Sequence, residues 1–410
     1  MNIKPFIFQS RSNDAKNKKC KPNNEVPSRL KRYPKRLSHI FYVYYNIQMT
    51  YPKIKSIVNG VPKKKYLQSD LLNIVLETSP NMSKPIVDTI SSIYKNSKIT
   101  SRYVSSLDFF YRPAKIEERL TAFKTIAMEL VIPMVCQALT ESNISNNDIH
   151  KIVFVSSTGL IAPSIDLEII KRLNLPPTCE RSNVLFMGCA AGINGIKNAC
   201  EYLNVEKNKN KNVLFVSIEL SSMHIHFTED INNIITHSIF SDGLSVIILS
   251  SSDKDVNDFE HVYVVDSFNY IIPDSSDGIT LFIDENSISC RLSKDLPRYI
   301  NEHILYALTL FLTNNKLTIE DIGFWAVHPG GKRILESVQN GLQLSADQLQ
   351  SSWEVLDQYG NMLSSSIMFV LEKFKNTVFP KNKNDYIFCI SFSFSPGVGI
   401  EFLLLKKILN

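Results

Sequence analysis

The sequence predicts an α/β protein with a largely buried sheet, built from two similar halves. Short runs of branched apolar residues recur at 151–159, 183–189 and 212–220, and segments with helical spacing of apolar residues lie between them. A strand–helix–strand order returns after residue 320, without a literal repeat. A chain of 410 residues is also too long for one simple core. We therefore expect a duplicated α/β architecture.

The composition is that of an ordinary globular protein, with 44% hydrophobic and 21% charged residues. No apolar run approaches the roughly 18 residues of a membrane span, so we expect none. The seven cysteines are odd in number and lack a CxxC pair. This favours a reducing, cytoplasmic location and argues against a disulfide framework or a zinc site.

The N-terminal segment is strongly basic. Residues 1–40 hold eleven Lys/Arg and two acids, which leaves 34 basic and 38 acidic residues, a net charge of −4, for the rest. The segment 10–36 is rich in Lys, Asn and Pro without an apolar period, so we expect residues 1–48 to be a disordered tail. A solvated linker is favoured over a nucleic-acid or membrane-surface role. The tail does not resemble a secretory signal peptide. A transit-peptide function stays open. Met49 offers an alternative translation start.

The elements are expected in the following order. Residues 66–140 are mostly helical, with Ser69 or Asp70 as an N-cap and with Pro133 kinking the helix over 118–139 or starting a new one. The first half then gives helices at 167–175 and after Cys189, and strands at 151–159, 183–189, 212–220 and 239–250. The second half gives a strand and glycine turn at 322–331, a helix at 362–374 and a strand at 385–397.

Cys189 stands at the break between a predicted strand and a predicted helix, in the stretch VLFMGCAAGINGIKNAC. A helix N-terminus favours a thiolate, and the small residues around Cys189 leave room for a substrate. A buried structural cysteine is the equally weighted alternative from local context. Cys200, in the middle of the following helix, is expected in the core.

A nucleophilic cysteine requires a base, and His328 in WAVHPGGKRIL ends an apolar strand where the glycines allow close approach of a ligand. Asn361 in QYGNMLSSS precedes a helix as Cys189 does, and its amide suits an oxyanion. His224, His226 and His237 come from a less regular region, and no metal site is expected there.

Four motifs in register carry a family resemblance: GCAAG around Cys189, FWAVHPGG around His328, YGNM around Asn361, and FSPGVGIE at 394–401. With the shorter matches VSSTG, SIEL, IFSDG and SKDLP, residues 50–410 resemble the type III polyketide synthases of the chalcone synthase family. The resemblance implies a thiolase-like duplicated αβαβα layered fold, with a Cys-bearing half at 49–265 and a His- and Asn-bearing half at 266–410. It also implies a homodimer that uses acyl-CoA and malonyl-CoA, with no cofactor, metal or carrier arm.

The resemblance also implies roles for the residues. Cys189 is the nucleophile and acyl anchor, while His328 and Asn361 hold the malonyl thioester oxygen as the enolate forms. His328 is further expected to pair with Cys189 and keep it ionised. Phe240 matches the family's gatekeeper phenylalanine. Further substrate-binding candidates are Ser157, Thr158, Glu219, His224, Cys290, Gly330, Leu363 and Phe394.

The chain departs from the plant enzymes at several of these positions. Cys290 replaces a second gatekeeper phenylalanine, which is expected to widen the cavity and favour an aliphatic starter. His224 replaces a cavity threonine. Leu363 replaces the serine of a hydroxyl network with Ser157 and Glu219, which favours Claisen closure or lactonisation over aldol closure. Candidates for gripping the CoA phosphates are Lys95, Lys98 and Arg102.

Three alternatives stay open. An initiating ketoacyl synthase shares the fold and triad but extends once, using carrier-bound malonate. A catalytically silent acyl-CoA-binding partner module is the second, although the intact triad argues against it. The third is a larger native unit in which the tail links to a fatty-acid-synthase-like starter donor. A papain-like protease is disfavoured, since GCAAG lacks that family's signature. The product is a phloroglucinol, a pyrone or a resorcinol type.

Overall fold

The computed structural model describes residues 51–78, 81–226, 230–251, 262–380 and 385–409. These belong to one compact unit, residues 50–410. The predicted tail at 1–48 and the alternative start Met49 therefore lie outside the described residues.

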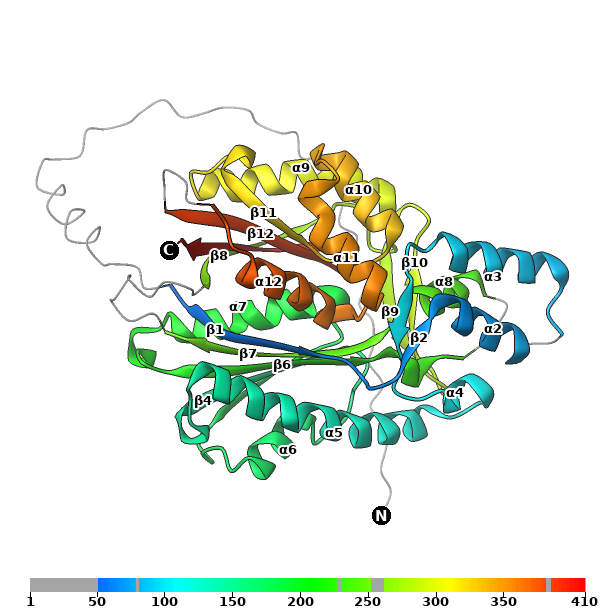
Figure 1. Ribbon diagram of the computed structural model, residues 1–410, viewed down its shortest axis with the longest axis horizontal. Coiled ribbons are helices and arrows are strands. Elements are labelled where there is room, and N and C mark those ends of the chain that lie inside the picture. Colours follow the sequence, from blue (N-terminus) through cyan, green and yellow to red (C-terminus); the bar gives the residue numbers. More distant parts are fainter. Residues whose placement is uncertain (1–50, 79–80, 227–229, 252–261, 381–384, 410) are drawn as a thin grey trace, which may run out of the picture. The chain divides into compact units, whose positions relative to one another are not determined.

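A nine-stranded sheet organises the molecule, in the order β11-β12-β13-β8-β1-β7-β6-β4-β5 (Figure 1). Pairs β4/β5, β4/β6 and β11/β12 are parallel, and the other pairs are antiparallel. The strands of this sheet are β1 (Lys53–Gly60), β4 (Ile149–Ser156), β5 (Glu180–Leu185), β6 (Asn212–Leu220), β7 (Asp242–Ser250), β8 (Val262–Ile271), β11 (Ile322–Val327), β12 (Tyr386–Ser395) and β13 (Gly399–Ile408). Small pairs outside it are β2 (Lys65–Leu67) with β3 (Ser101–Tyr103) and β9 (Ile279–Ile283) with β10 (Ile288–Leu292).

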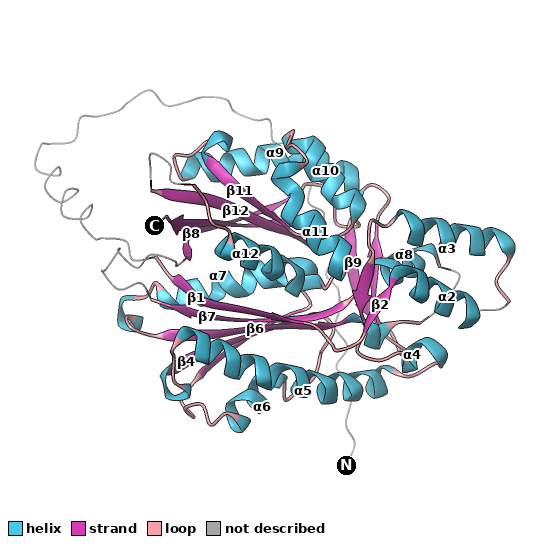
Figure 2. Ribbon diagram, viewed as in Figure 1, coloured by secondary structure: helices cyan, strands magenta, loops and turns pink. Residues whose placement is uncertain are grey.

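Helices cover both faces of the sheet and lie between its two halves (Figure 2). The helices are α2 (Gln68–Thr78), α3 (Lys84–Asn96), α4 (Asp108–Tyr111), α5 (Ile116–Ser142), α6 (Ile165–Arg172), α7 (Ala191–Leu203), α8 (Ile231–Ile239), α9 (Leu296–Asn314), α10 (Lys332–Leu342), α11 (Gln350–Tyr359) and α12 (Ser366–Asn376). α7 and α12 form the middle layer, α5 and α6 cover the first half, and α9 and α10 cover the second (Figure 1). The layers therefore run α–β–α–β–α, as the sequence resemblance implies.

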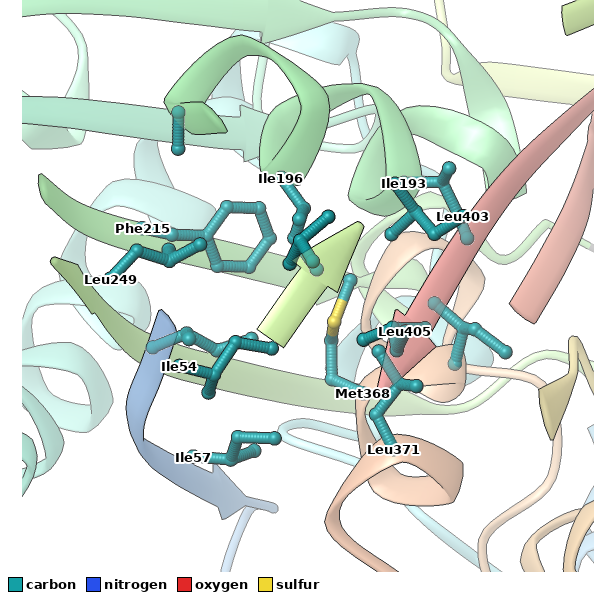
Figure 3. Close-up of a cluster of buried hydrophobic side chains, with 14 of the residues drawn as sticks. Ile54, Ile57, Ile193, Ile196, Phe215, Leu249, Met368, Leu371, Leu403 and Leu405 are labelled. Carbon is teal, nitrogen blue, oxygen red and sulfur yellow. The ribbon is translucent and has the colours of Figure 1, made fainter. Parts of the chain in front are cut away.

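The middle layer holds the two halves together through one apolar cluster (Figure 3). Ile193 and Ile196 of α7 and Met368 and Leu371 of α12 pack there against buried side chains of both sheet halves, Ile54, Ile57, Phe215, Leu249, Leu403 and Leu405. β1 joins the halves directly, pairing with β7 along its length and with β8 at two positions. The predicted boundary between residues 265 and 266 falls within β8.

Most predicted elements form, and the strand predicted at 212–220 is β6. Two local predictions are wrong. α2 begins at Gln68, so Ser69 and Asp70 lie inside its first turn and are not N-caps. Pro133 starts no helix, because α5 continues through it.

α5 is long and apolar enough, by length and composition, to cross a membrane, which we did not expect from the sequence. Its apolar face is nevertheless occupied. Phe123, Ala127, Val131 and Val135 are fully buried in the cluster that α5 forms with strands of the first half. The structure therefore uses α5 as a core helix.

Candidate active site

Cys189 lies in a short 3₁₀ turn, Gly188–Ala190, between the end of β5 and the start of α7. The chain enters this turn with positive φ at Phe186 and Gly188, of 62° and 59°. The Gly188 amide donates a hydrogen bond of 2.9 Å to Ser157 Oγ, which holds the turn against the end of β4. The sequence prediction of a cysteine at a strand–helix break is confirmed.

The small residues after Cys189 have another function than the one we predicted. A Cβ at Gly192 would lie 2.3 Å from the Ser364 carbonyl oxygen, and Ala190 and Ala191 are fully buried. These residues let the segment after Asn361 pack directly on the Cys189 turn. They allow the Cys189 turn and the segment after Asn361 to approach each other closely, and they provide no room for a substrate.

His328 and Asn361 reach Cys189 from the second half. His328 follows β11, and its amide donates to the Phe392 carbonyl at 3.0 Å. The Asn361 side-chain Nδ2 lies 3.9 Å from Cys189 Sγ and donates to the Gly330 carbonyl at 3.1 Å, while its Oδ1 accepts from the Leu363 amide at 2.8 Å. These bonds fix the orientation of the amide, and Cys189 Sγ lies 4.0 Å from its Oδ1 and 3.9 Å from its Nδ2.

The three predicted catalytic residues line one cavity of about 40 Å³. Apart from these three, its walls are almost entirely apolar: Gly188, Ile239, Phe240, Ile279, Leu281, Cys290, Leu292, Leu296, Gly330, Ile334, Leu363 and Phe394. Predicted substrate-binding residues Phe240, Cys290, Gly330, Leu363 and Phe394 are therefore brought together with the triad.

Burial sets the protonation of Cys189 and His328. It raises the pKa of the Cys189 thiol above its usual range, and the nearby Cys290 thiol adds to this, against the hydrogen bond from Asn361. Burial also lowers the pKa of His328 to about 3. Neither ring nitrogen of His328 has a hydrogen-bond partner among the described residues. Burial therefore favours the neutral forms of the thiol and the imidazole, and the ion pair expected from the sequence stays a prediction.

A second cavity of about 40 Å³ adjoins the first. Its walls are more polar than those of the first cavity and include Ser157, Thr158, Ser221, His224, His226, Asn233, Thr236, His237 and Ser289. Phe240, Leu281, Cys290 and Leu363 line both cavities and form the partition between them. Leu281 of the hairpin β9–β10 and Leu363 line both cavities together with Cys290, and the widening expected from Cys290 stays a prediction.

His224 stabilises the wall of the second cavity through hydrogen bonds of both its ring nitrogens. Nε2 donates to the Thr158 carbonyl at 2.7 Å, and Nδ1 accepts from the Ile288 amide at 3.2 Å. These bonds require the neutral ring, and burial lowers the pKa of His224 to about 4. Where the plant enzymes have threonine, this chain thus has a crosslink between the β4 loop and β10.

The hydroxyl network around Glu219 differs from the one we predicted. Its carboxylate accepts from the Ser157 amide at 3.0 Å, from Thr158 Oγ1 at 2.6 Å and from Ser364 Oγ at 2.5 Å. Burial raises the pKa of Glu219 to about 7, against the hydrogen bonds from these residues. The sequence comparison placed the third member at Leu363, whereas the structure uses Ser364. The run of three serines at 364–366 was the available signal.

Arg102, predicted to grip CoA, is fully buried. Its guanidinium donates to Gln68 Oε1 at 2.8 Å and to the carbonyls of His237 and Phe240 at 2.6 and 2.7 Å. It therefore caps the C-terminal end of α8 and positions Phe240. Lys95 and Lys98 line a separate groove of about 370 Å³ beside Trp353.

A tunnel of about 680 Å³ leads to the catalytic cavity, with which it shares Ile239, Leu292, Leu296, Gly330 and Ile334. Its cations are Lys294, Lys332 and Arg333, which come from the SKDLP and HPGGKR segments. The sequence analysis missed these three. Within the described residues no group of three or more His, Cys, Asp or Glu is arranged to hold a metal ion.

A half-buried thiol that lines one cavity with an imidazole and an amide, in a five-layered fold, is typical of a thiol-dependent condensing enzyme. Comparisons with known proteins agree. The family described as "FAE1/Type III polyketide synthase-like protein" matches residues 59–314, and "Chalcone and stilbene synthases, C-terminal domain" matches residues 263–409.

Individual relatives cover nearly the whole described unit. Alpha-pyrone synthesis polyketide synthase-like Pks18 of Mycobacterium tuberculosis is 34% identical over 87% of this chain and 91% of its own length. Polyketide synthase 37 of Dictyostelium discoideum is 34% identical over 85% of this chain, which matches 12% of that protein. The crystal structure of PKS-I from the brown alga Ectocarpus siliculosus superimposes with a TM-score of 0.83 at 38% identity, over 88% of this chain and all of that one.

The chain belongs to the type III polyketide synthases and is a malonyl-CoA-dependent acyltransferase. The predicted family, fold class and enzyme class are confirmed.

Proposed function

We propose that the enzyme loads an aliphatic acyl-CoA starter onto Cys189 and extends it by repeated decarboxylative condensation with malonyl-CoA. The chain then closes by lactonisation or Claisen condensation. The observation that carries this proposal is that Cys189, His328 and Asn361 line one cavity with otherwise apolar walls. Such walls suit an aliphatic starter, since each buried methylene contributes about 0.8 kcal/mol.

The loading step follows from the protonation states. Cys189 attacks the acyl thioester as its proton passes to the free lone pair of neutral His328, and coenzyme A leaves with that proton. In the extension step His328 acts as the other neutral tautomer, with its proton on the nitrogen that faces the cavity, and this N–H and the Asn361 Nδ2 donate to the malonyl thioester oxygen. They stabilise the enolate that forms as carbon dioxide leaves. The enolate carbon then attacks the acyl group on Cys189 and releases the thiolate.

Ring closure is proposed at the partition of the two cavities. Leu363 presents an alkyl side chain to both of them, whereas Ser364, whose hydroxyl donates to Glu219, lines neither cavity. The relative named for alpha-pyrone synthesis supports lactonisation. We therefore favour a pyrone, with a phloroglucinol-type product by Claisen closure second.

The phosphates of coenzyme A are assigned to the tunnel cations. Lys294, Lys332 and Arg333 line the tunnel around the start of α10, where the helix dipole also favours anions. Arg102 is unable to bind the phosphates, because it is buried and its guanidinium already donates to the carbonyl groups of His237 and Phe240.

A homodimer is proposed through β5. This strand lies at one edge of the nine-stranded sheet and is mostly exposed or half-buried. An edge strand of this kind pairs readily with a second copy. Light scattering of the purified chain tests this, and a monomer would contradict it.

The function is tested by incubating the purified chain with malonyl-CoA and with starters from acetyl-CoA to lauroyl-CoA, plus coumaroyl-CoA. Products are identified by mass spectrometry, with Cys189→Ala in parallel. We expect products with two or more malonate units, best from an aliphatic starter and absent with the variant. Products of a single extension would instead indicate a ketoacyl synthase. No acylation of Cys189 by any starter would indicate a silent acyl-CoA-binding module.

A further inference from the structure

We propose that Arg119 is a positioning residue that sets product specificity, because it holds the turn that carries His224 in the wall of the second cavity. The inference rests on the proposed function, in which the extended chain closes its ring at the partition between the two cavities. It adds a residue that lines neither cavity to those that control the product.

Arg119 is a fully buried cation in the first turn of α5. Its Nη1 donates to the Met223 carbonyl at 2.6 Å and to the Ile225 carbonyl at 2.9 Å, and its Nε donates to the Ala114 carbonyl at 3.3 Å. Burial lowers the pKa of Arg119 to about 10, so the guanidinium remains charged at neutral pH. A planar guanidinium, with several donors in a fixed arrangement, is suited to hold carbonyl groups of separate segments at once.

The two carbonyls that accept from Nη1 belong to the residues on either side of His224. The His224 ring in turn donates to the Thr158 carbonyl at 2.7 Å and accepts from the Ile288 amide at 3.2 Å. Burial lowers the pKa of His224 to about 4, and the charge of Arg119 acts in the same direction. Arg119 therefore fixes the backbone from which this crosslink starts and favours the neutral ring that the crosslink needs.

The turn at residues 221–226 forms part of the cavity wall. It supplies four lining residues, Ser221, His224, Ile225 and His226. The start of the turn is anchored separately, because Asp242 accepts from the Ser222 amide at 2.8 Å and from the Ser222 hydroxyl. Loss of Arg119 should therefore release His224 and the residues beside it without displacing β6, from which the turn starts.

The catalytic residues are held by other contacts. The Ser157 hydroxyl holds the turn that carries Cys189, and backbone groups of the second half hold the Asn361 side chain. None of these bonds involves Arg119 or residues 221–226. We therefore expect loss of Arg119 to change which product forms and to leave the acylation of Cys189 unchanged.

The experiment measures loading and product in the same protein. Single-turnover acylation of Cys189 by hexanoyl-CoA, followed by intact-protein mass spectrometry, measures loading. Mass spectrometry of the products from hexanoyl-CoA and malonyl-CoA gives the ratio of products with one additional malonate unit to the main native product. In Arg119→Met we expect this ratio to rise roughly threefold or more, with a loading rate within about twofold of native. The reason is that a released wall leaves the chain more room before ring closure.

Arg112→Met is the matched control. The Cζ atoms of Arg112 and Arg119 lie 5.5 and 4.8 Å from the centre of the same Phe109 ring, but Arg112 is exposed and pairs with Glu118. We expect the native product ratio in this control. Lysine keeps the charge but lacks the planar guanidinium, so Arg119→Lys should shift the ratio in the same direction as Arg119→Met. It carries the test if Arg119→Met does not fold.

A double variant tests whether Arg119 acts through His224. His224→Ala removes the crosslink directly, and we expect Arg119→Met/His224→Ala to give the product ratio of His224→Ala alone. A double-variant shift equal to the two single shifts multiplied together would overturn this link.

The outcomes separate this proposal from the proposed function. A native product ratio in both Arg119→Met and Arg119→Lys, or the same shift in Arg112→Met, overturns the positioning role alone. Equal losses of loading and of product with an unchanged ratio also overturn it, because Arg119 then only stabilises the fold. If the native enzyme forms no product with two or more malonate units, the proposed function fails and the positioning role with it.

Discussion

Phe240 and Asn361 are joined by a backbone bridge that connects the two halves of the site. The Asn361 amide donates to the Ile239 carbonyl at 2.8 Å, and the Ser241 amide donates to the Asn361 carbonyl at 2.9 Å. Phe240 forms part of the cavity partition, and Asn361 faces the thiol. Displacing either residue therefore displaces the other.

Gly360→Ala tests this coupling. Gly360 has a φ of +70°, and a Cβ there would lie 2.9 Å from Arg102 Cγ and 3.0 Å from the Ile239 carbonyl oxygen. Arg102 is held by three hydrogen bonds and is unable to move aside. The control is Gly397→Ala, where φ is +74° and nothing lies within 4 Å. We expect the control to lose about 1 kcal/mol of unfolding free energy and Gly360→Ala about 3 kcal/mol.

The two variants Gly360→Ala and Gly397→Ala also distinguish the effect of backbone strain on stability from an effect on catalysis. Gly360→Ala should also reduce kcat for malonyl-CoA decarboxylation, because Asn361 shifts, whereas Gly397→Ala should leave it unchanged. Urea denaturation and release of labelled carbon dioxide measure the two effects. Equal losses in both variants would show that positive φ alone matters and that the bridge does not couple the residues.

Arg102→Met should destabilise the protein by about 3 kcal/mol or more, because it leaves the carbonyls of His237 and Phe240 and the Gln68 side chain without their donors. Arg298→Met is the control, since Arg298 is exposed and its pairs with Asp295 and Glu302 are worth little. Urea midpoints measure both. A loss below about 1 kcal/mol for Arg102→Met would mean that the carbonyls find other donors.

Acid should destabilise the fold through its buried histidines. Burial lowers the pKa of His224 to about 4 and that of His237 and His328 to about 3, from 6.5. Because the unfolded chain binds these protons and the folded chain does not, stability is full above pH 6.5. It is lost as pH falls toward 4, by about 1.4 kcal/mol per pH unit for each histidine.

His328→Gln should lower that slope by about 1.4 kcal/mol per pH unit, the contribution of one histidine. Unfolding free energies between pH 6.5 and 4.5 provide the measurement. A His328→Gln slope equal to the wild-type slope would mean that His328 is protonated in the folded state.

Leu363→Ser tests the ring-closure proposal. Leu363 has a φ of 46° and lines both cavities, so its side chain sits on the partition. Serine adds a hydroxyl there, and we expect a larger share of aldol-type resorcinol products by mass spectrometry and NMR. Leu363→Ala makes the same space without a hydroxyl and should not raise that share. Mainly resorcinol products from the native enzyme would contradict the proposal.

The sequence predicted the architecture of the site well, because its motifs are local. Cys189, His328 and Asn361 each sit in a strand or turn whose pattern is visible within about ten residues. The same holds for β6, a continuous apolar run that is buried along its whole length.

The errors came from long-range contacts. Arg102 looks like an exposed cation in sequence, and only the carbonyls of His237 and Phe240, more than 130 positions away, make it a buried one. Ser364 and not Leu363 donates to Glu219, a residue 145 positions away, and only the run of serines at 364–366 pointed to it. The role of Gly192 depends on the Ser364 carbonyl in the other half. The contacts of Arg102 and Gly192 have no local sequence signal.

The central claim is that Cys189 carries the acyl chain. Incubation with hexanoyl-CoA alone, followed by intact-protein and peptide mass spectrometry, tests it most directly, with Cys189→Ala and Cys290→Ala as the paired variants. We expect one hexanoyl group per chain on the peptide that contains Cys189, present in Cys290→Ala and absent in Cys189→Ala. A hexanoyl group on Cys290, or one that persists in Cys189→Ala, would contradict it.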